Sequence, residues 1–195
     1  MIGSLRGRII FKSPPQLTVE VGGVGYELEV PMSTFFHLPA VGQEVKLLTH
    51  LVVREDAHVL YAFGTEDERR LFRSLIRVSG VGPKIALALL SGISVAGFAE
   101  CVQREDIAAL TRIPGVGRKT AERLIVEMRD RLAAAVDGAG ALSGGTVSAE
   151  NEAYGALIAL GYRPAEATRL LKAVGPGTHS TEELIRRALQ GAARE

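Results

Sequence analysis

The spacing of apolar residues divides the chain into a strand-rich part followed by two helical parts. Over residues 1–64, short runs that alternate apolar and polar positions are separated by turn residues, which predicts strands. The clearest pair is 16–21 and 24–30, which flank the two-glycine turn of a hairpin. About five strands in such a short segment favour a small closed barrel, with an OB-fold as the natural candidate.

Residues 65–136 have the spacing of amphipathic helices instead. Thr65 precedes three acidic residues, which predicts a helix start because acids are favoured beside the positive end of the helix dipole. A long helix is predicted over 120–135, since Leu124, Ile125 and Met128 lie on one side of it.

The composition of the chain changes after the helical part that ends at residue 136. Residues 137–149 are mostly Gly, Ala and Ser, which is typical of a flexible linker. Residues 150–195 then predict a bundle of three short amphipathic helices, near 151–160, 164–173 and 180–190. A small bundle on a tether is more typical of a docking module than of a catalytic one.

Composition narrows the class of protein. The net charge of +1 indicates no partner by itself, and aromatic residues make up only 5% of the chain, which argues against binding by base stacking. The single cysteine, Cys101, excludes an intrachain disulfide. No run resembles a signal peptide or reaches the ~18–20 apolar residues of a membrane span, so we expect a cytoplasmic protein without a membrane partner.

One pattern occurs twice, at residues 78–86 and 113–121. Each copy has a glycine, a valine, a second glycine, a lysine two positions on and an alanine two positions after that. The aligned pairs are Gly80 and Gly115, Gly82 and Gly117, Lys84 and Lys119, and Ala86 and Ala121. A glycine turn that opens a helix presents backbone N–H groups beside the positive end of the helix dipole, which suits a phosphate. Two such turns predict a grip on a phosphate backbone rather than on one nucleotide.

Each copy is expected to lie between two helices, which matches the helix-hairpin-helix motif of proteins that bind DNA without sequence specificity. A Walker loop would need G-x-x-x-x-G-K-[ST], which is absent from the sequence, and a Rossmann turn would follow a strand. Basic residues gather near both turns, where they can neutralise phosphates; any single arginine could equally be an ordinary solvated surface residue. These residues are Arg69, Arg70, Arg73, Arg77, Arg112, Arg118 and Arg123.

Glu55 and Asp56 form a second candidate feature, at the expected tip of a hairpin between two apolar runs. They could be a solvated turn, or they could repel phosphates and hold DNA strands apart. A two-metal nuclease would need a further ligand, and the nearby Asp67 and Glu68 have the positions of helix-start residues. The four histidines lack metal-ligand spacing, so we expect no catalytic residue, no metal site and no cofactor.

With these features together, the chain resembles the RuvA family, the bacterial Holliday-junction-binding subunits of the branch-migration machine, over essentially its full length. The matching runs are residues 1–3, 21–27, 49–50, 52–56, 80–84, 119–128 and 160–162. Two departures are Arg118, where a lysine is common, and the short linker rich in Gly and Ala.

The resemblance implies an α+β multidomain protein. It has an N-terminal OB-fold barrel (1–64), a central all-α tandem helix-hairpin-helix domain (65–136) and a mobile C-terminal three-helix domain (150–195) that binds the RuvB motor. It also implies a homotetramer with four-fold symmetry, or an octamer on DNA, that holds Holliday junctions open during recombination and repair. ATP hydrolysis would belong to RuvB, and RuvC resolvase would join the larger complex.

Carried onto this chain, the resemblance places an acidic pin at Glu55 and Asp56. The implied DNA-binding residues are Ser79, Gly80, Val81, Gly82, Lys84, Gly115, Val116, Gly117, Arg118, Lys119, Thr120 and Arg123. The alternatives are a helix-hairpin-helix DNA-processing enzyme, either a glycosylase or a structure-specific nuclease, and a general duplex-binding module. A glycosylase would need an aromatic-lined pocket for a flipped base, whereas residues 65–136 contain only Phe72 and Phe98 as aromatic residues.

Overall fold

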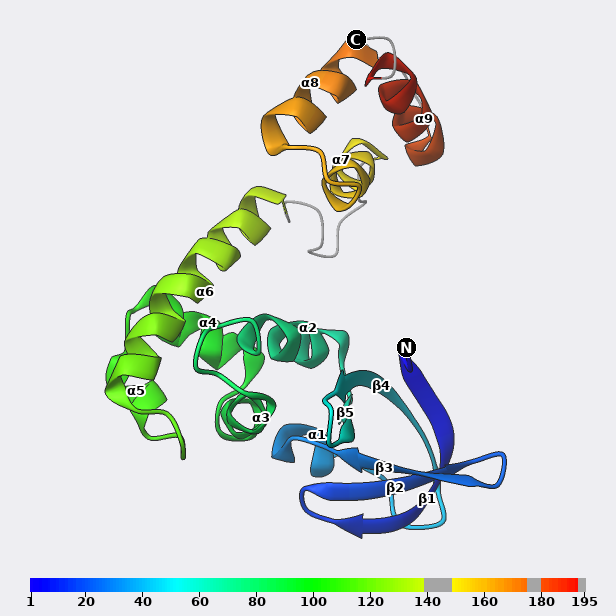
Figure 1. Cartoon of the computed structure of the whole chain (residues 1–195), viewed down its shortest axis with the longest axis vertical. Helices are drawn as coiled ribbons and strands as arrows, with labels where there is room; N and C mark the ends of the chain where they lie inside the picture. Colours follow the sequence, from blue (N-terminus) through cyan, green and yellow to red (C-terminus); the bar gives the residue numbers. More distant parts are fainter. Residues whose placement is uncertain (139–148, 175–179, 193–195) are drawn as a thin grey trace. The chain divides into compact units, whose positions relative to one another are not determined.

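The computed structural model describes residues 1–138, 149–174 and 180–192 (Figure 1). It divides into two compact units, a first unit, Met1–Arg129, and a second unit, Asp130–Glu195. Residues 139–148 of the expected linker lie outside the described residues.

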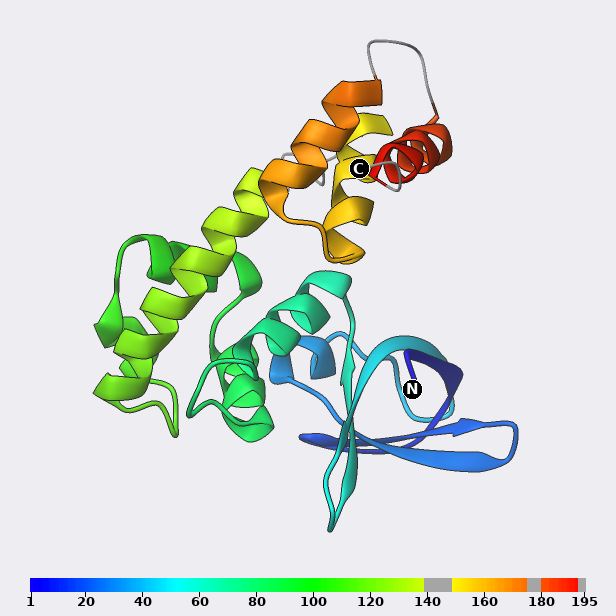
Figure 2. The same cartoon turned by 45° about the horizontal axis from the view of Figure 1, so that its top comes forward.

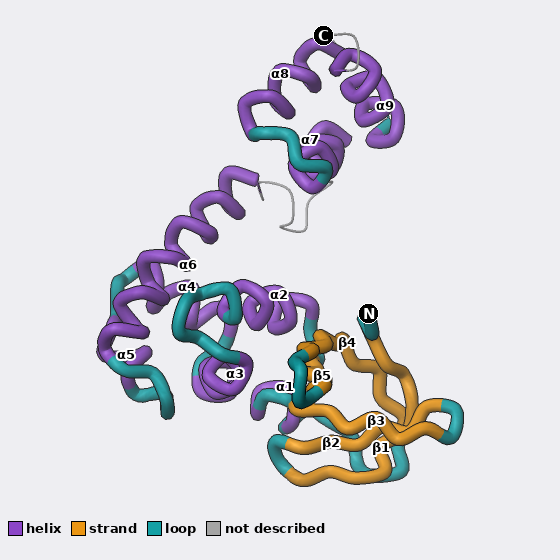
Figure 3. The backbone as a smooth tube through the Cα atoms, in the orientation of Figure 1, coloured by secondary structure: helices purple, strands orange, loops and turns teal. Residues whose placement is uncertain are grey.

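The strands of the first unit close into the barrel that the alternating pattern predicts (Figure 3). Their order around the barrel is β1-β2-β3-β5-β4, and only the β3–β5 pair is parallel. Gly22 and Gly23 have φ values of 59° and 84°, the left-handed conformation that a tight hairpin turn requires. The strands are β1 (Ser4–Ser13), β2 (Gln16–Val21), β3 (Val24–Glu29), β4 (Glu44–Val53) and β5 (His58–Phe63), with the short helix α1 (Met32–Phe35) between β3 and β4.

Helices make up the rest of the first unit, and their starts follow local side-chain chemistry. Thr65 accepts a hydrogen bond from the N–H of Glu68, whose carboxylate reaches back to the N–H of Thr65, so the pair forms a capping box. Ser94 and Asp106 are the N-caps of the helices that begin at Val95 and Ile107, and the side chain of each accepts one backbone N–H, from Gly97 and Ala109 respectively. The helices are α2 (Glu66–Leu75), α3 (Pro83–Gly92), α4 (Val95–Gln103), α5 (Ile107–Thr111) and α6 (Arg118–Gly138), the last of which begins in the first unit and continues past Arg129 into the second.

The Glu68 carboxylate also joins α2 to the barrel. It accepts hydrogen bonds from the hydroxyls of Ser33 and Thr34 on α1, the latter at 2.7 Å, and from the N–H of Gly64 at 3.2 Å. Glu68 is only 9% exposed, and a buried carboxylate is stable only when such donors satisfy it. This network therefore fixes the start of the helices on the end of β5.

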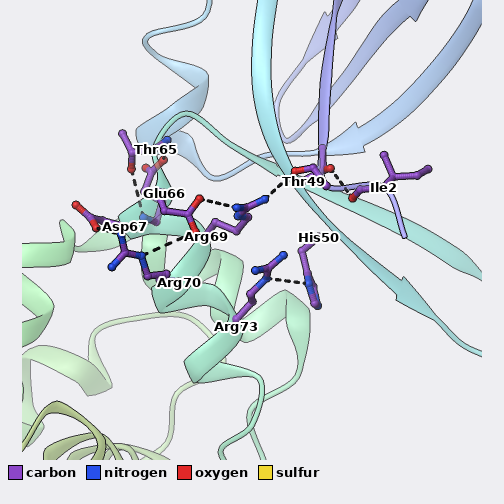
Figure 4. Close-up of polar contacts among 11 residues, drawn as sticks. Ile2, Thr49, His50, Thr65, Glu66, Asp67, Arg69, Arg70 and Arg73 are labelled. Carbon is purple, nitrogen blue, oxygen red and sulfur yellow. Dashed lines mark hydrogen bonds and ion pairs between the residues drawn. The ribbon is translucent and has the colours of Figure 1, made fainter. Parts of the chain in front are cut away.

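Aromatic packing and two arginines extend the same contact along α2. The Phe72 ring is fully buried, with its centroid 4.9 Å from those of both Tyr61 and Phe63. Arg69 donates to the carbonyl oxygen of Gly3 at 2.7 Å, and Arg73 donates to Nδ1 of His50 at 3.3 Å (Figure 4). These arginines therefore hold α2 against the barrel.

The second unit forms a three-helix arrangement in its described residues. Its helices are α7 (Ala149–Ala159), α8 (Pro164–Val174) and α9 (Thr181–Ala192). Leu157, Ala167, Leu170 and Ala188 form their small shared core. No single helix in the described ranges is long and apolar enough to cross a membrane, and α3 and α4, which together have that length and composition, are bent by 97° relative to each other.

We expect Glu68→Gln to lower the free energy of unfolding by about 1–3 kcal/mol, because an amide cannot accept all of the hydrogen bonds that the carboxylate accepts. Asp67→Asn is the matched control, since Asp67 lies in the same helical turn but its side chain is 71% exposed. Denaturant unfolding of both full-length variants measures the difference. Equal stability of the two variants would contradict a structural role for the Glu68 network.

Candidate nucleic-acid interface

The two glycine patterns fold into turns with the same backbone hydrogen bonds. In the first turn (residues 78–82), the N–H of Val81 donates to the carbonyl of Val78 at 3.0 Å. In the second turn (residues 113–117), the N–H of Val116 donates to the carbonyl of Ile113 at 3.0 Å. The repeat in the sequence is therefore a repeat in structure, each copy leading directly into a helix.

Each turn contains two glycines, and the structure favours glycine at the two positions for different reasons. Gly80 and Gly115 have φ values of 86° and 84°, a conformation that side chains rarely adopt. At Gly82 and Gly117, by contrast, an added Cβ would meet nothing within 4 Å among the described residues. The space in front of the second glycine of each turn is therefore open to a ligand.

The apolar residues of the turns serve as anchors rather than as contact surfaces. Val81 is 4% exposed and Val116 is 5% exposed, and their N–H groups are already used inside the turns. Ala86 and Ala121 are fully buried, as expected for close packing of each following helix. Of the predicted DNA-binding residues, the two valines can therefore act only by holding the turn in shape or through their carbonyl oxygens.

The first residues of α3 supply the free donors. Gly82 is the N-cap and has no side chain, and Pro83 follows at the first helical position, so the next N–H groups, those of Lys84 and Ile85, have no acceptor inside the helix. These N–H groups lie beside the positive end of the helix dipole, which favours an anion. Lys119 and Thr120 take the equivalent places at the start of α6, where Arg118 stands at the position of Pro83.

The predicted basic residues have different environments. Lys84 and Lys119 are exposed beside their turns. Arg118 is also exposed, but its Nε lies 2.9 Å from a carboxylate oxygen of Glu122, one helical turn away, so part of its charge is compensated. Thr120 is half-buried. The lysines are therefore the residues most available for phosphate contacts.

Arg123 crosses from the second motif to the first. Its Nη1 donates to the carbonyl oxygen of Ser79 at 3.0 Å and to the Ser79 hydroxyl at 3.1 Å. The sequence predicts Arg123 and Ser79 as separate DNA contacts, and their spacing along the chain carries no signal that they meet.

Glu55 and Asp56 lie at the tip of the β4–β5 hairpin, which projects from the barrel in Figure 2. Val53 and His58 form the last strand pair, and the N–H of Arg54 donates to the carbonyl of Ala57 at 2.8 Å to close the tip. Both acidic side chains are exposed. The hairpin therefore holds two exposed carboxylates at its tip, away from the barrel wall.

Burial and charge act on His50 at the base of this hairpin. The pKa of His50 is lowered from its ordinary value of 6.5, chiefly by burial and then by the nearby Arg73 and Arg69. A neutral His50 can accept the hydrogen bond from Arg73, so the contact between α2 and β4 is preserved near neutral pH.

In the described ranges, no group of three or more His, Cys, Asp or Glu side chains is placed to hold a metal ion.

The barrel, the two paired turns and the separate helical unit define a tandem helix-hairpin-helix protein with an OB-like N-terminal barrel. Three family models match it in order: the RuvA N terminal domain at residues 1–62, the SAM-like helix-hairpin-helix tandem at 72–130, and the RuvA C-terminal domain at 148–193.

Curated relatives match the chain from end to end. The chain is 56% identical to the Holliday junction branch migration complex subunit RuvA of Alkalilimnicola ehrlichii, with 100% of both chains covered. It is 55% identical to the protein of the same description from Methylococcus capsulatus, again with 100% of both chains covered. A third such relative, from Pseudomonas savastanoi, is 56% identical over 98% of this chain and 99% of its own length. The chain belongs to the RuvA family.

We expect Lys84→Ala and Lys119→Ala each to weaken binding to duplex DNA of any sequence. If each lysine neutralises one phosphate, the slope of log K against log salt should fall by about 0.9 per substitution. Lys46→Ala is the control, because Lys46 is an exposed lysine on β4 of the barrel. Titrations at several salt concentrations measure the slopes, and slopes unchanged from wild type would remove the two lysines from the interface.

Proposed function

We propose that this chain binds four-way DNA junctions through their phosphate backbones, holds them open and recruits the RuvB ATPase for branch migration in recombination and repair. The observation that carries the proposal is the pair of matched turns, each with an open approach, helix-start N–H groups and an exposed lysine, on the same unit as an acidic hairpin. Backbone contacts of this kind give affinity that does not depend on sequence.

The proposed assembly is a homotetramer with four-fold symmetry, in which each subunit faces one arm of the junction. Two tetramers could enclose the DNA as an octamer, and RuvC would join the larger complex. The C-terminal three-helix domain within residues 150–195 would bind RuvB. ATP hydrolysis is assigned to RuvB because this sequence has no phosphate-binding loop of the Walker type. We expect the complex to work in the cytoplasm.

Glu55 and Asp56 are proposed as an acidic pin near the crossover. Carboxylates repel the phosphates of a continuous duplex, and this repulsion acts over the Debye length of about 8–10 Å. At an open junction the strands diverge around the centre, so the same charges meet fewer phosphates. The pin would thus favour a junction over linear duplex without forming an attractive contact.

Competition between a four-way junction and linear duplex tests the proposed function. The wild-type chain should prefer the junction, while a general duplex-binding module would not. A processing enzyme, either a glycosylase or a nuclease, would instead break strands or release bases from junctions or damaged duplex. Strand cleavage that purifies with the chain would contradict the proposal.

The pin is tested in the same competition with Glu55→Gln/Asp56→Asn. We expect duplex affinity to rise by about three- to tenfold at fixed salt, because the repulsive charges are removed and screening leaves only part of their effect. Glu20→Gln/Glu27→Gln is the matched control, since it removes two exposed acids from the barrel wall instead. An unchanged ratio of junction to duplex affinity would make the tip an ordinary solvated turn.

We expect deletion of residues 150–195 to leave junction binding nearly intact and to abolish RuvB-driven branch migration. The reason is that the turns and the hairpin lie in Met1–Arg129, apart from the unit that contains α7, α8 and α9. A gel shift and a migration assay with added RuvB measure the two properties separately. Migration by the truncated protein would place RuvB docking elsewhere in the chain.

A further inference from the structure

The two turns have the same backbone but are braced by different side chains. Arg123, on the helix of the second motif, reaches the first turn and donates to both the carbonyl and the hydroxyl of Ser79. The equivalent position in the first motif is Ala88, which has no donor to offer in return. The second turn instead meets an apolar side chain, because a Cβ at Gly115 would lie 3.6 Å from Cγ1 of Ile85.

The contact on Ser79 acts at a sensitive place in the first turn. Ser79 directly precedes Gly80, whose positive φ sets the direction of the following chain. A guanidinium that holds the Ser79 carbonyl limits rotation of the peptide between Ser79 and Gly80. The guanidinium also occupies the Ser79 carbonyl oxygen, which would repel a phosphate if the peptide turned that oxygen toward it. Through this contact a residue of the second motif reaches the segment of chain that leads to the N–H groups beyond Gly82.

We propose that Arg123 is a positioning residue, which orders the first turn through Ser79 and so couples the two turns into one phosphate clamp. This inference rests on the proposed function in assuming that the turns bind DNA phosphates. It assigns Arg123 a role different from that of Lys84 and Lys119, which contribute charge beside a turn. Binding by the first turn should then respond to Arg123 even where Arg123 touches no DNA.

Hydrogen exchange of the free, full-length protein tests the positioning itself. Arg123→Met removes the donors and keeps the apolar stem, and Arg118→Met is the matched control on the same helix. Loss of hydrogen bonds to a charged donor should speed exchange of the Val81 N–H, which donates to the Val78 carbonyl inside the first turn, by about three- to tenfold in Arg123→Met. Exchange of the Val116 N–H, which makes the equivalent hydrogen bond to Ile113 in the second turn, should stay unchanged, and Arg118→Met should affect neither turn.

Arg123→Lys should partly restore slow exchange, since an ammonium can still donate to Ser79. Exchange in the first turn that is the same in Arg123→Met as in wild type would overturn the proposal. This readout needs no DNA, so it stands even if the proposed function fails. Failure of the proposed function would appear separately, as absence of junction binding by the wild-type chain.

A double-mutant cycle with Lys84 tests the coupling on a four-way junction. If Arg123 were only one more phosphate ligand, Arg123→Met would lower the salt slope by about 0.9 and Lys84→Ala would have the same effect in both backgrounds. If Arg123 positions the first turn, Lys84→Ala should cost less affinity in the Arg123→Met background than in wild type. Additive losses would contradict the coupling.

Discussion

The buried carboxylate of Glu68 is the constraint on which the first unit depends. It caps α2 and at the same time accepts hydrogen bonds from Thr34 and Gly64, so the helices begin at a fixed point on the barrel. The first turn follows α2 directly, since the N–H of Val78 donates to the carbonyl of Leu75 at 2.9 Å. Phe72 packs on β5, the strand that returns from the acidic hairpin. One short helix thus sets where a turn and the hairpin tip lie relative to each other.

The fixed positions of the turn and the hairpin tip matter because the charges of a phosphate backbone are regularly spaced. A protein that reads no bases gains selectivity only by matching the shape of the DNA. In the proposed function the two turns would supply attraction that does not depend on sequence, and the hairpin tip would supply the repulsion that favours a junction over duplex. Arg123 adds a second rigid link, from one turn to the other, so that the contacts can act together.

Much of the fold could be predicted from local sequence. The two-glycine hairpin, the helix start at Thr65 and the paired glycine turns were all expected from residues close together in the chain, and the structure confirms them. The ion pair of Arg118 with Glu122 also has a sequence signal, because residues four apart on a helix are neighbours. These features follow from local backbone and helix geometry alone.

The long-range polar contacts could not be predicted in this way. Arg69 and Arg73 have the sequence context of phosphate-neutralising residues, yet they bind Gly3 and His50 of the barrel. Glu68 has the pattern of a helix cap, and nothing local indicates that its carboxylate also meets α1. Side-chain partners that are distant in the chain depend on how the barrel closes, which the pattern of apolar residues does not specify.

Hydroxyl-radical footprinting of the full-length chain on a four-way junction tests the central claim most directly. Two turns and a repulsive tip on one rigid unit should protect short backbone segments in all four arms, at the same distance from the crossover in each. The pattern should stay the same when the arm sequences are exchanged. Protection that follows the sequence, or that is confined to one arm, would contradict the account.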